Sequence, residues 1–154
     1  FEYSLLNDIN FTILRFGTLW GPRASKTNAI YSYLSQAAKS NKIEVMGSGD
    51  EIREYIHVKD ASKISVNLLG EEQKGLTYIL TGHHQTKLRD LIETIKELVN
   101  KDISINYLGN SSSHYLRTPY QYKDDNAEKI ILNTYQDMGV SLLSLYSDMK
   151  KNIE

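Results

Sequence analysis

The sequence of 154 residues contains no cysteine and only two prolines, and no apolar run reaches the length of a membrane span. Without cysteine, neither a disulfide framework nor a thiolate site can form, which suits a cytoplasmic protein. A membrane-spanning helix would need about 20 consecutive apolar residues. Eighteen basic residues nearly balance nineteen acidic ones, so the charge has no excess that attracts nucleic acid or an anionic membrane. We therefore expect a cytoplasmic protein that binds neither.

Patterns typical of several kinds of active site are missing as well. No serine lies in a nucleophile elbow with histidine and aspartate partners. No Gly-x-x-Gly-x-x-Gly turn is present to cradle a phosphate. Metal-ligand spacing is absent from the four histidines, which are His57, His83, His84 and His114. We therefore predict no metal ligand in this chain.

Short apolar runs alternate with apolar stripes at helical spacing, a pattern that predicts an α/β fold. Two runs are of the kind buried in parallel sheets, Thr12–Gly17 and Leu76–Gly82. Shorter strands are expected at 43–46, 53–58 and 104–108. Helices are expected at 28–39, 61–69, 88–99 and 125–132, and after Gly139. Their predicted N-caps are Asp60, Thr86 and, in a capping box with Glu128, Asp125.

The strongest single candidate for a ligand-binding residue is Arg53. It follows the turn Gly47–Glu51 and opens a predicted strand, so a rigid element would hold its guanidinium group. The planar fork of a guanidinium suits bidentate recognition of phosphate better than a lysine ammonium does. From residue type alone, a solvated arginine at a strand end is the alternative.

Two motifs together resemble those of a known family. They are Leu14-Arg-Phe-Gly-Thr-Leu-Trp-Gly-Pro-Arg23 and, after a Gly-x-Gly turn, Arg53-Glu-Tyr-Ile-His-Val-Lys-Asp60. Both resemble the substrate half of the extended short-chain dehydrogenase/reductases, the family of NAD-dependent sugar-nucleotide epimerases and dehydratases. The resemblance implies an α/β fold that is the C-terminal part of a Rossmann-like enzyme. That part has two edge parallel strands and a small mixed α/β substrate-binding subdomain.

The resemblance implies a nucleoside-diphosphate sugar as ligand and assigns roles to several residues. Arg53 would contact the diphosphate, and Tyr55, the aromatic of the same motif, would lie in the substrate site. Glu54 replaces the usual aspartate and keeps its charge. Thr18 stands where an asparagine usually binds the pyrophosphate; it can still donate one hydrogen bond, or it is a plain turn residue.

Other matched positions imply further parts of the site. Phe16 and Gly17 would lie beside the nicotinamide end of the cofactor. Glu44 and Met46 match a strand that passes the nucleotide base, although Met46 alternatively belongs to the core. Arg117 would replace a second diphosphate-binding arginine whose usual Arg-Pro-Gly-Asp context is absent here.

The family's reaction is the oxidation of a sugar hydroxyl by hydride transfer to NAD or NADP, followed by hydride return or loss of water. Its acid/base is a tyrosine with a lysine four residues on. Of the two such strings here, Tyr55–Lys59 lies on a predicted strand, where the two residues are ~13 Å apart. The other, Tyr146–Lys150, belongs to an apolar helical stripe. We therefore assign no catalytic residue to this chain.

We expect residues 1–154 to form one domain, the substrate-binding portion, with the cofactor-binding portion outside them. Such a chain would be inactive alone and would bind the cofactor poorly. In the family, Thr12–Gly17 and Leu76–Gly82 are neighbours at one edge of a larger parallel sheet. An open strand edge pairs readily with other chains, so we also expect self-association through this edge and its apolar flanks. The alternatives are a non-catalytic nucleotide-binding or scaffold module, and a related NAD(P)-dependent reductase of a non-nucleotide carbonyl.

Overall fold

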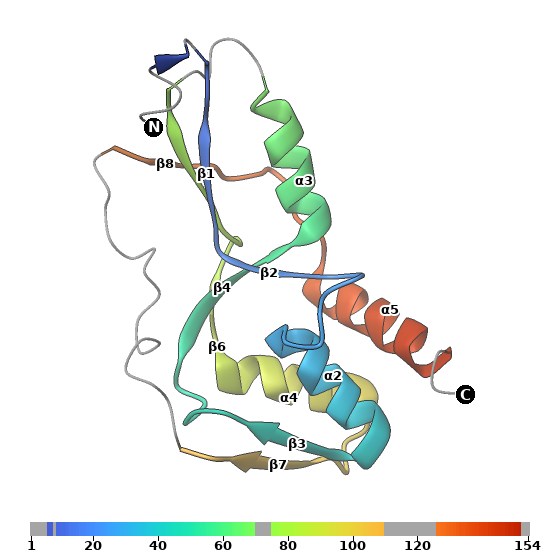
Figure 1. Cartoon of the computed structure of the whole chain (residues 1–154). Coiled ribbons are helices and arrows are strands. Elements are labelled where there is room, and N and C mark those ends of the chain that lie inside the picture. Colours follow the sequence, from blue (N-terminus) through green and yellow to red (C-terminus); the bar gives the residue numbers. More distant parts are fainter. Residues whose placement is uncertain (1–5, 8, 70–74, 110–125, 152–154) are drawn as a thin grey trace.

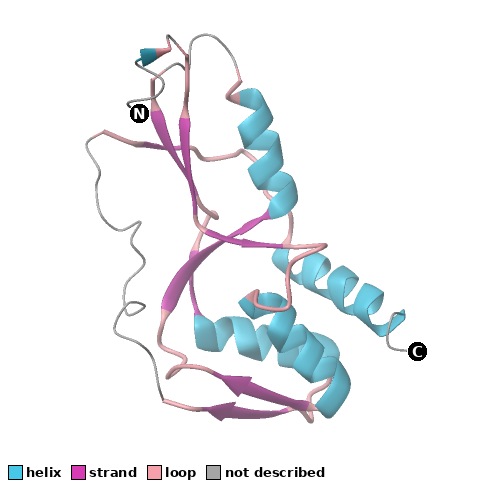
Figure 2. Cartoon of the chain, viewed as in Figure 1, coloured by secondary structure: helices cyan, strands magenta, loops and turns pink. Residues whose placement is uncertain are grey.

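The computed structural model describes residues 6–7, 9–69, 75–109 and 126–151 (Figure 1). It has the expected α/β fold, with helices and strands alternating along the chain (Figure 2). The strands are β1 (Ile13–Phe16), β2 (Thr18–Trp20), β3 (Lys42–Val45), β4 (Ile52–His57), β5 (Thr77–Leu80), β6 (Gln85–Lys87), β7 (Ser104–Tyr107) and β8 (Glu128–Lys129). The helices are α2 (Ala29–Ser40), α3 (Val58–Asn67), α4 (Leu88–Val99) and α5 (Met138–Lys151). Within these described ranges, no helix is long and apolar enough to cross a membrane.

The upper part of the molecule in Figure 1 contains β1, β5, β8 and α3. β1 and β5 pair in parallel, as predicted, with Ile13 opposite Thr77 and Phe16 opposite Leu80. β8 pairs with the other edge of β5, so β1 is an edge strand among the described residues. A small core lies between these strands and α3; its buried members are Ile56, Ala61, Ile64, Tyr78 and Leu80.

The lower part contains α2, α4 and α5 with the two-stranded parallel sheet β3–β7 (Figure 1). Its larger core confirms the apolar stripes predicted for the helices at 28–39 and 88–99. The buried residues of those stripes are Ile30, Tyr33, Leu34 and Ala37 on α2, and Leu88, Leu91, Ile92 and Ile95 on α4. Asn28 caps α2, because its side chain accepts a hydrogen bond from the backbone N–H of Tyr31 at 3.2 Å.

A third sheet, β2–β4–β6, joins the two parts. The chain enters this sheet twice from the upper part, and at each entry a glycine, Gly17 before β2 and Gly82 before β6, lies against the backbone of β4. A Cβ at Gly82 would lie 1.8 Å from the carbonyl oxygen of Tyr55, and one at Gly17 would lie 2.8 Å from that of Glu54. No side chain fits at the first position, so the crossing of these segments depends on glycine.

Three predicted helix starts are wrong. α3 begins at Val58 and is capped by His57, whose Nδ1 accepts from the N–H of Lys59 at 3.3 Å. Asp60 lies inside this helix and accepts instead from the backbone N–H of Gln136 at 3.0 Å. Thr86 belongs to β6, which pairs with β4. At the third predicted helix start, Glu128 begins β8 rather than a helix, because pairing with β5 outweighs the local capping pattern. The predicted cap, Asp125, lies outside the described residues.

Candidate functional site

The sheet β2–β4–β6 brings three of the predicted site residues onto one face. Thr18 is the parallel partner of Tyr55, and Arg53 is the antiparallel partner of Thr86. Directly paired residues point to the same face of a sheet, and so do residues two apart along one strand. Thr18, Arg53, Tyr55 and Thr86 therefore share a face of the sheet.

Arg53 is partly buried rather than surrounded by bulk solvent. Its Nη1 donates to the carbonyl oxygen of Ile52 at 2.8 Å. Burial raises the pKa of the Tyr55 and Tyr33 phenols, and the positive charge of Arg53 opposes that rise in both. The guanidinium group thus lies beside two neutral tyrosines, one on β4 and one on α2.

The turn before Arg53 is held by Glu51, a residue that the motif comparison did not single out. Its buried carboxylate accepts from the backbone N–H groups of Ser48 at 2.9 Å and Gly49 at 2.8 Å. Burial alone would raise the pKa of Glu51, but these hydrogen bonds outweigh it, so the pKa is lowered. The backbone carbonyl of Glu51 also accepts from the N–H of Leu88 at the start of α4. Arg53 therefore extends from a turn fixed by an ionised side chain.

Glu54 points to the opposite face from Arg53 and is 4% exposed. Its Oε2 lies 2.9 Å from the ammonium of Lys129 on β8, and its Oε1 accepts from Gln85 at 3.4 Å. Burial raises its pKa, but Thr81, Lys129 and Gln85 together outweigh burial and lower it. The carboxylate that replaces the motif's usual aspartate is thus an ion-pair partner of the C-terminal segment.

Phe16 and Gly17 lie at the carboxyl end of β1, next to the carboxyl end of β5. Ligands of open parallel sheets bind beyond such strand ends. However, the missing side chain of Gly17 has a local explanation, since the backbone of Glu54 occupies the space that a Cβ would need. Phe16 is partly buried against the upper core.

Glu44 and Met46 lie on the outer side of the β3–β7 sheet, away from the core. Glu44 forms an exposed ion pair with Lys42 at 2.8 Å. Met46 follows the end of β3 and is 64% exposed, so the interpretation of Met46 as a core residue is wrong. The remaining predicted residue, Arg117, lies outside the described residues.

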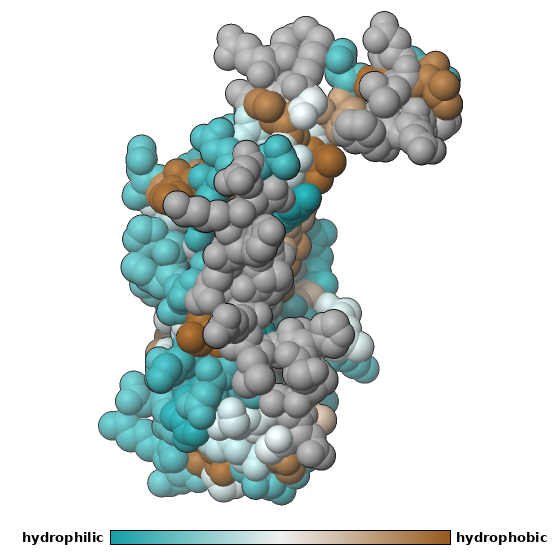
Figure 3. All heavy atoms as spheres, turned by 90° about the vertical axis from the view of Figure 1, so that its left-hand side faces the viewer, coloured by the Kyte–Doolittle hydropathy of each residue, from teal (hydrophilic) through white to brown (hydrophobic). Residues whose placement is uncertain are grey.

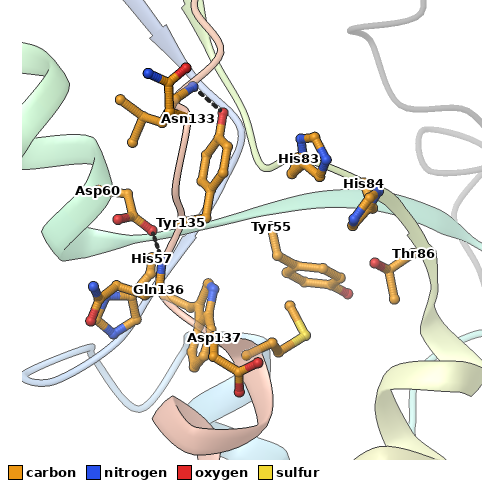
Figure 4. Close-up of a pocket in the computed structure, with 13 residues that line it drawn as sticks. Tyr55, His57, Asp60, His83, His84, Thr86, Asn133, Tyr135, Gln136 and Asp137 are labelled. Atoms are coloured by element: carbon orange, nitrogen blue, oxygen red, sulfur yellow. Dashed lines mark hydrogen bonds between the residues drawn. The ribbon is translucent and has the colours of Figure 1, made fainter.

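A cleft of about 410 Å³ opens on the face that carries Tyr55 and Thr86 (Figure 4). Its wall is formed by β4 and β6, by the turn between β5 and β6, and by the segment that leads into α5. The lining residues are Trp20, Tyr55, His57, Asp60, His83, His84, Thr86, Leu132, Asn133, Tyr135, Gln136, Asp137 and Met138. From the sequence, the paired histidines were considered only as possible metal ligands, and Thr86 only as a helix cap.

Trp20, His57 and Asp60 line one part of the cleft. The rings of Trp20 and His57 meet edge to face, with centroids 4.9 Å apart. Burial lowers the pKa of His57, with a smaller opposing effect from Asp60, so its imidazole is neutral near pH 7. No group of three or more potential metal-binding side chains occurs in the described parts of the chain.

A family model matches about half of the chain. Residues 2–80 match the model described as the NAD dependent epimerase/dehydratase family. The matched range includes both motifs, the turn that Glu51 holds, and strands β1 to β5.

Among curated proteins, the chain is 27% identical over 82 residues to dTDP-glucose 4,6-dehydratase 1 of Escherichia coli K12, covering 53% of this chain and 23% of that protein. It is 26% identical over 127 residues to UDP-glucuronic acid decarboxylase 6 of Arabidopsis thaliana, covering 81% of this chain and 36% of that protein. The chain therefore spans well under half the length of these relatives.

Solved structures share the fold over nearly the whole chain. UDP-N-acetylglucosamine 4-epimerase of Methanobrevibacter ruminantium superimposes with a TM-score of 0.81 at 15% identity, over 98% of this chain and 49% of that one. UDP-glucuronic acid 4-epimerase of Bacillus cereus, solved with UDP-glucuronic acid and NAD, gives 0.78 at 19% identity, over 99% and 49%.

Proposed function

Because the chain belongs to the NAD-dependent epimerase/dehydratase family, we propose that its residues form the substrate-binding portion of an enzyme that acts on a nucleoside-diphosphate sugar. The observation that carries this proposal is the position of Arg53. Its guanidinium group extends from the turn held by Glu51 and shares one sheet face with Thr18 and Tyr55. A fixed cation beside two hydroxyl groups suits a diphosphate.

In this proposal each part of the ligand has its own residues. Arg53 binds the diphosphate, with Thr18 and Tyr55 donating hydrogen bonds to it. Glu44 and Met46 flank the base. The exposure of Met46 supports this role, because an exposed apolar side chain is available to a ligand. Arg117 supplies a second cation. The domain arrangement proposed here is a single substrate-binding domain over residues 1–154.

The cofactor of the family is NAD, and Phe16 and Gly17 would border it at the carboxyl end of β1. The residues of this chain fit only the edge of such a site, because the glycine turn that cradles a dinucleotide is absent from the sequence. Hydride transfer is the chemistry that the cofactor supplies in the family. This chain's residues would bind and orient the sugar nucleotide, so we propose that the chain alone has no turnover.

We further propose that the chain self-associates through β1. This strand has one described neighbour, and large apolar side chains are exposed around it: Ile9 is 49%, Ile13 39% and Leu76 45% exposed. On the face seen in Figure 3, hydrophobic side chains gather mainly in the upper part. Light scattering at increasing concentration should give a rising mean mass, and a constant monomer mass would contradict this part.

Isothermal calorimetry tests the proposed function. The protein is titrated with UDP-, dTDP- and GDP-glucose, and the tightest ligand is then titrated into Arg53→Ala and Arg53→Lys. Loss of a charged hydrogen-bonding partner should weaken binding about 10- to 100-fold in the alanine variant. The lysine variant should lose less, since it keeps the charge without the fork. Lys63→Ala, which removes an exposed cation from α3, is the control and should bind normally.

A further inference from the structure

The cleft beside Tyr55 differs in chemistry from the surroundings of Arg53. The described residues that line it include no lysine or arginine, and they include two aspartates, Asp60 and Asp137. Each aspartate accepts one backbone hydrogen bond, Asp60 from Gln136 at 3.0 Å and Asp137 from Val140 at 2.7 Å. Both carboxylates have a second oxygen. A phosphate would meet two aspartates and no lysine or arginine among these residues, so the cleft suits an uncharged ligand that carries hydroxyl donors.

Three aromatic rings in contact with one another also line the cleft. The rings of His83 and His84 lie 4.1 Å apart, and His83 faces Tyr135 with centroids 5.6 Å apart. Figure 4 shows these side chains and Tyr55 around one opening. Flat rings can cover the apolar face of a saturated sugar ring, while Thr86 offers a hydroxyl group at its edge. At about 410 Å³, the cleft lies within the ~300–1,000 Å³ typical of small-molecule sites.

The cleft and Arg53 are direct neighbours on the sheet. Thr86, which lines the cleft, is the antiparallel partner of Arg53. Paired residues in an antiparallel ladder have Cα atoms about 4.5–5.5 Å apart. Tyr55, two residues along β4 from Arg53, also lines the cleft and points to the same face of the sheet. A ligand with a diphosphate at Arg53 could therefore place the next ring in the cleft.

We infer that this cleft holds the uncharged hexose ring of the nucleotide sugar and that His83 and His84 contribute to its recognition. This inference rests on the proposed function, because it needs the diphosphate at Arg53. It adds a preference: a neutral hexose is favoured over a uronic acid, whose carboxylate would face Asp60 and Asp137.

The test compares two ligands in each variant, the tightest-binding nucleoside-diphosphate glucose and the nucleoside diphosphate alone. His83→Ala and His84→Ala remove exposed rings and should fold normally. We expect each variant to bind the nucleotide sugar about 2- to 10-fold more weakly, the range for one lost aromatic contact. Its affinity for the nucleoside diphosphate should stay unchanged. Lys87→Ala is the matched control, because Lys87 is exposed on the same strand as Thr86 and points to its other face.

The outcomes separate the two proposals. If the histidine variants bind the nucleotide sugar as wild type does, or lose both ligands equally, the cleft does not hold the hexose and this inference is wrong. Tighter binding of the corresponding nucleotide uronate than of the glucose compound would also overturn it. If Arg53→Ala leaves binding of the diphosphate unchanged, the proposed function fails, and the inference fails with it.

Discussion

Glu54 and Lys129 lie 75 positions apart in the sequence, yet their charged atoms are 2.9 Å apart. The pair joins β4, which carries Arg53, to β8 at the edge of the upper sheet. Glu54 is buried, whereas about a third of the Lys129 side chain is exposed. The two partners therefore differ in what their removal leaves behind.

Replacing Lys129 should destabilise the protein more than neutralising Glu54. Lys129→Ala leaves a buried carboxylate without its cation, which we expect to cost about 1–3 kcal/mol. Glu54→Gln removes the charge that needs a partner and leaves an ammonium that water can reach, so its cost should be smaller. Urea denaturation of both variants measures the free energies of unfolding. A larger loss of stability in Glu54→Gln than in Lys129→Ala would contradict this account of the ion pair.

The stability that Glu54 contributes should depend on pH. Its pKa is lowered in the folded state, so its contribution is present above its unfolded pKa near 4.3 and is lost as pH falls through its folded pKa. The stability difference between wild type and Glu54→Gln should therefore shrink at acidic pH. Urea denaturation between pH 7 and pH 3 checks this, and a difference that stays constant over that range would contradict it.

His57 should give a second pH dependence in a higher range. Burial lowers its pKa in the folded state, so the unfolded state takes up a proton first as pH falls. Stability should then decrease as pH drops below the unfolded value near 6.5. His57→Asn keeps an N-cap acceptor for α3 and cannot titrate. It should remove the part of the slope between pH 7 and pH 5 that comes from this residue, and an unchanged slope would contradict this assignment.

Gly82 should tolerate no side chain, because a Cβ there would lie 1.8 Å from the carbonyl oxygen of Tyr55. Gly82→Ala must push β4 away from the segment that joins β5 to β6, and we expect a loss of about 3 kcal/mol or more, or failure to fold. Gly139→Ala is a matched control inside α5, where the nearest atom lies at 3.5 Å. It should stabilise the helix by about 0.5–1 kcal/mol. Similar thermal unfolding of the two variants would contradict the crossing seen here.

Much of this fold follows from local patterns. The strands at 12–17 and 76–82 and the stripes of α2 and α4 were predictable, because apolar runs and hydrophobic periodicity mark regular elements. The burial predicted for the run at 12–17 is wrong, however, since no residue of β1 is buried in the structure. The errors fall where contacts with a distant segment determine the local structure. Asp60 has the residue type of a cap but bonds to Gln136, and the helix predicted at 125–132 gives way to a strand that pairs with β5. Similarly, His83 contacts Tyr135 in the cleft, and no local sequence pattern predicts this contact.

The central claim is that Arg53 binds the diphosphate, and the most direct measurement compares a nucleoside diphosphate with its nucleoside by calorimetry. In wild type, the diphosphate should bind much more tightly. In Arg53→Ala, binding of the diphosphate should weaken about 10- to 100-fold, while the weak binding of the nucleoside stays the same. Equal affinities of wild type and Arg53→Ala for the diphosphate would contradict the account.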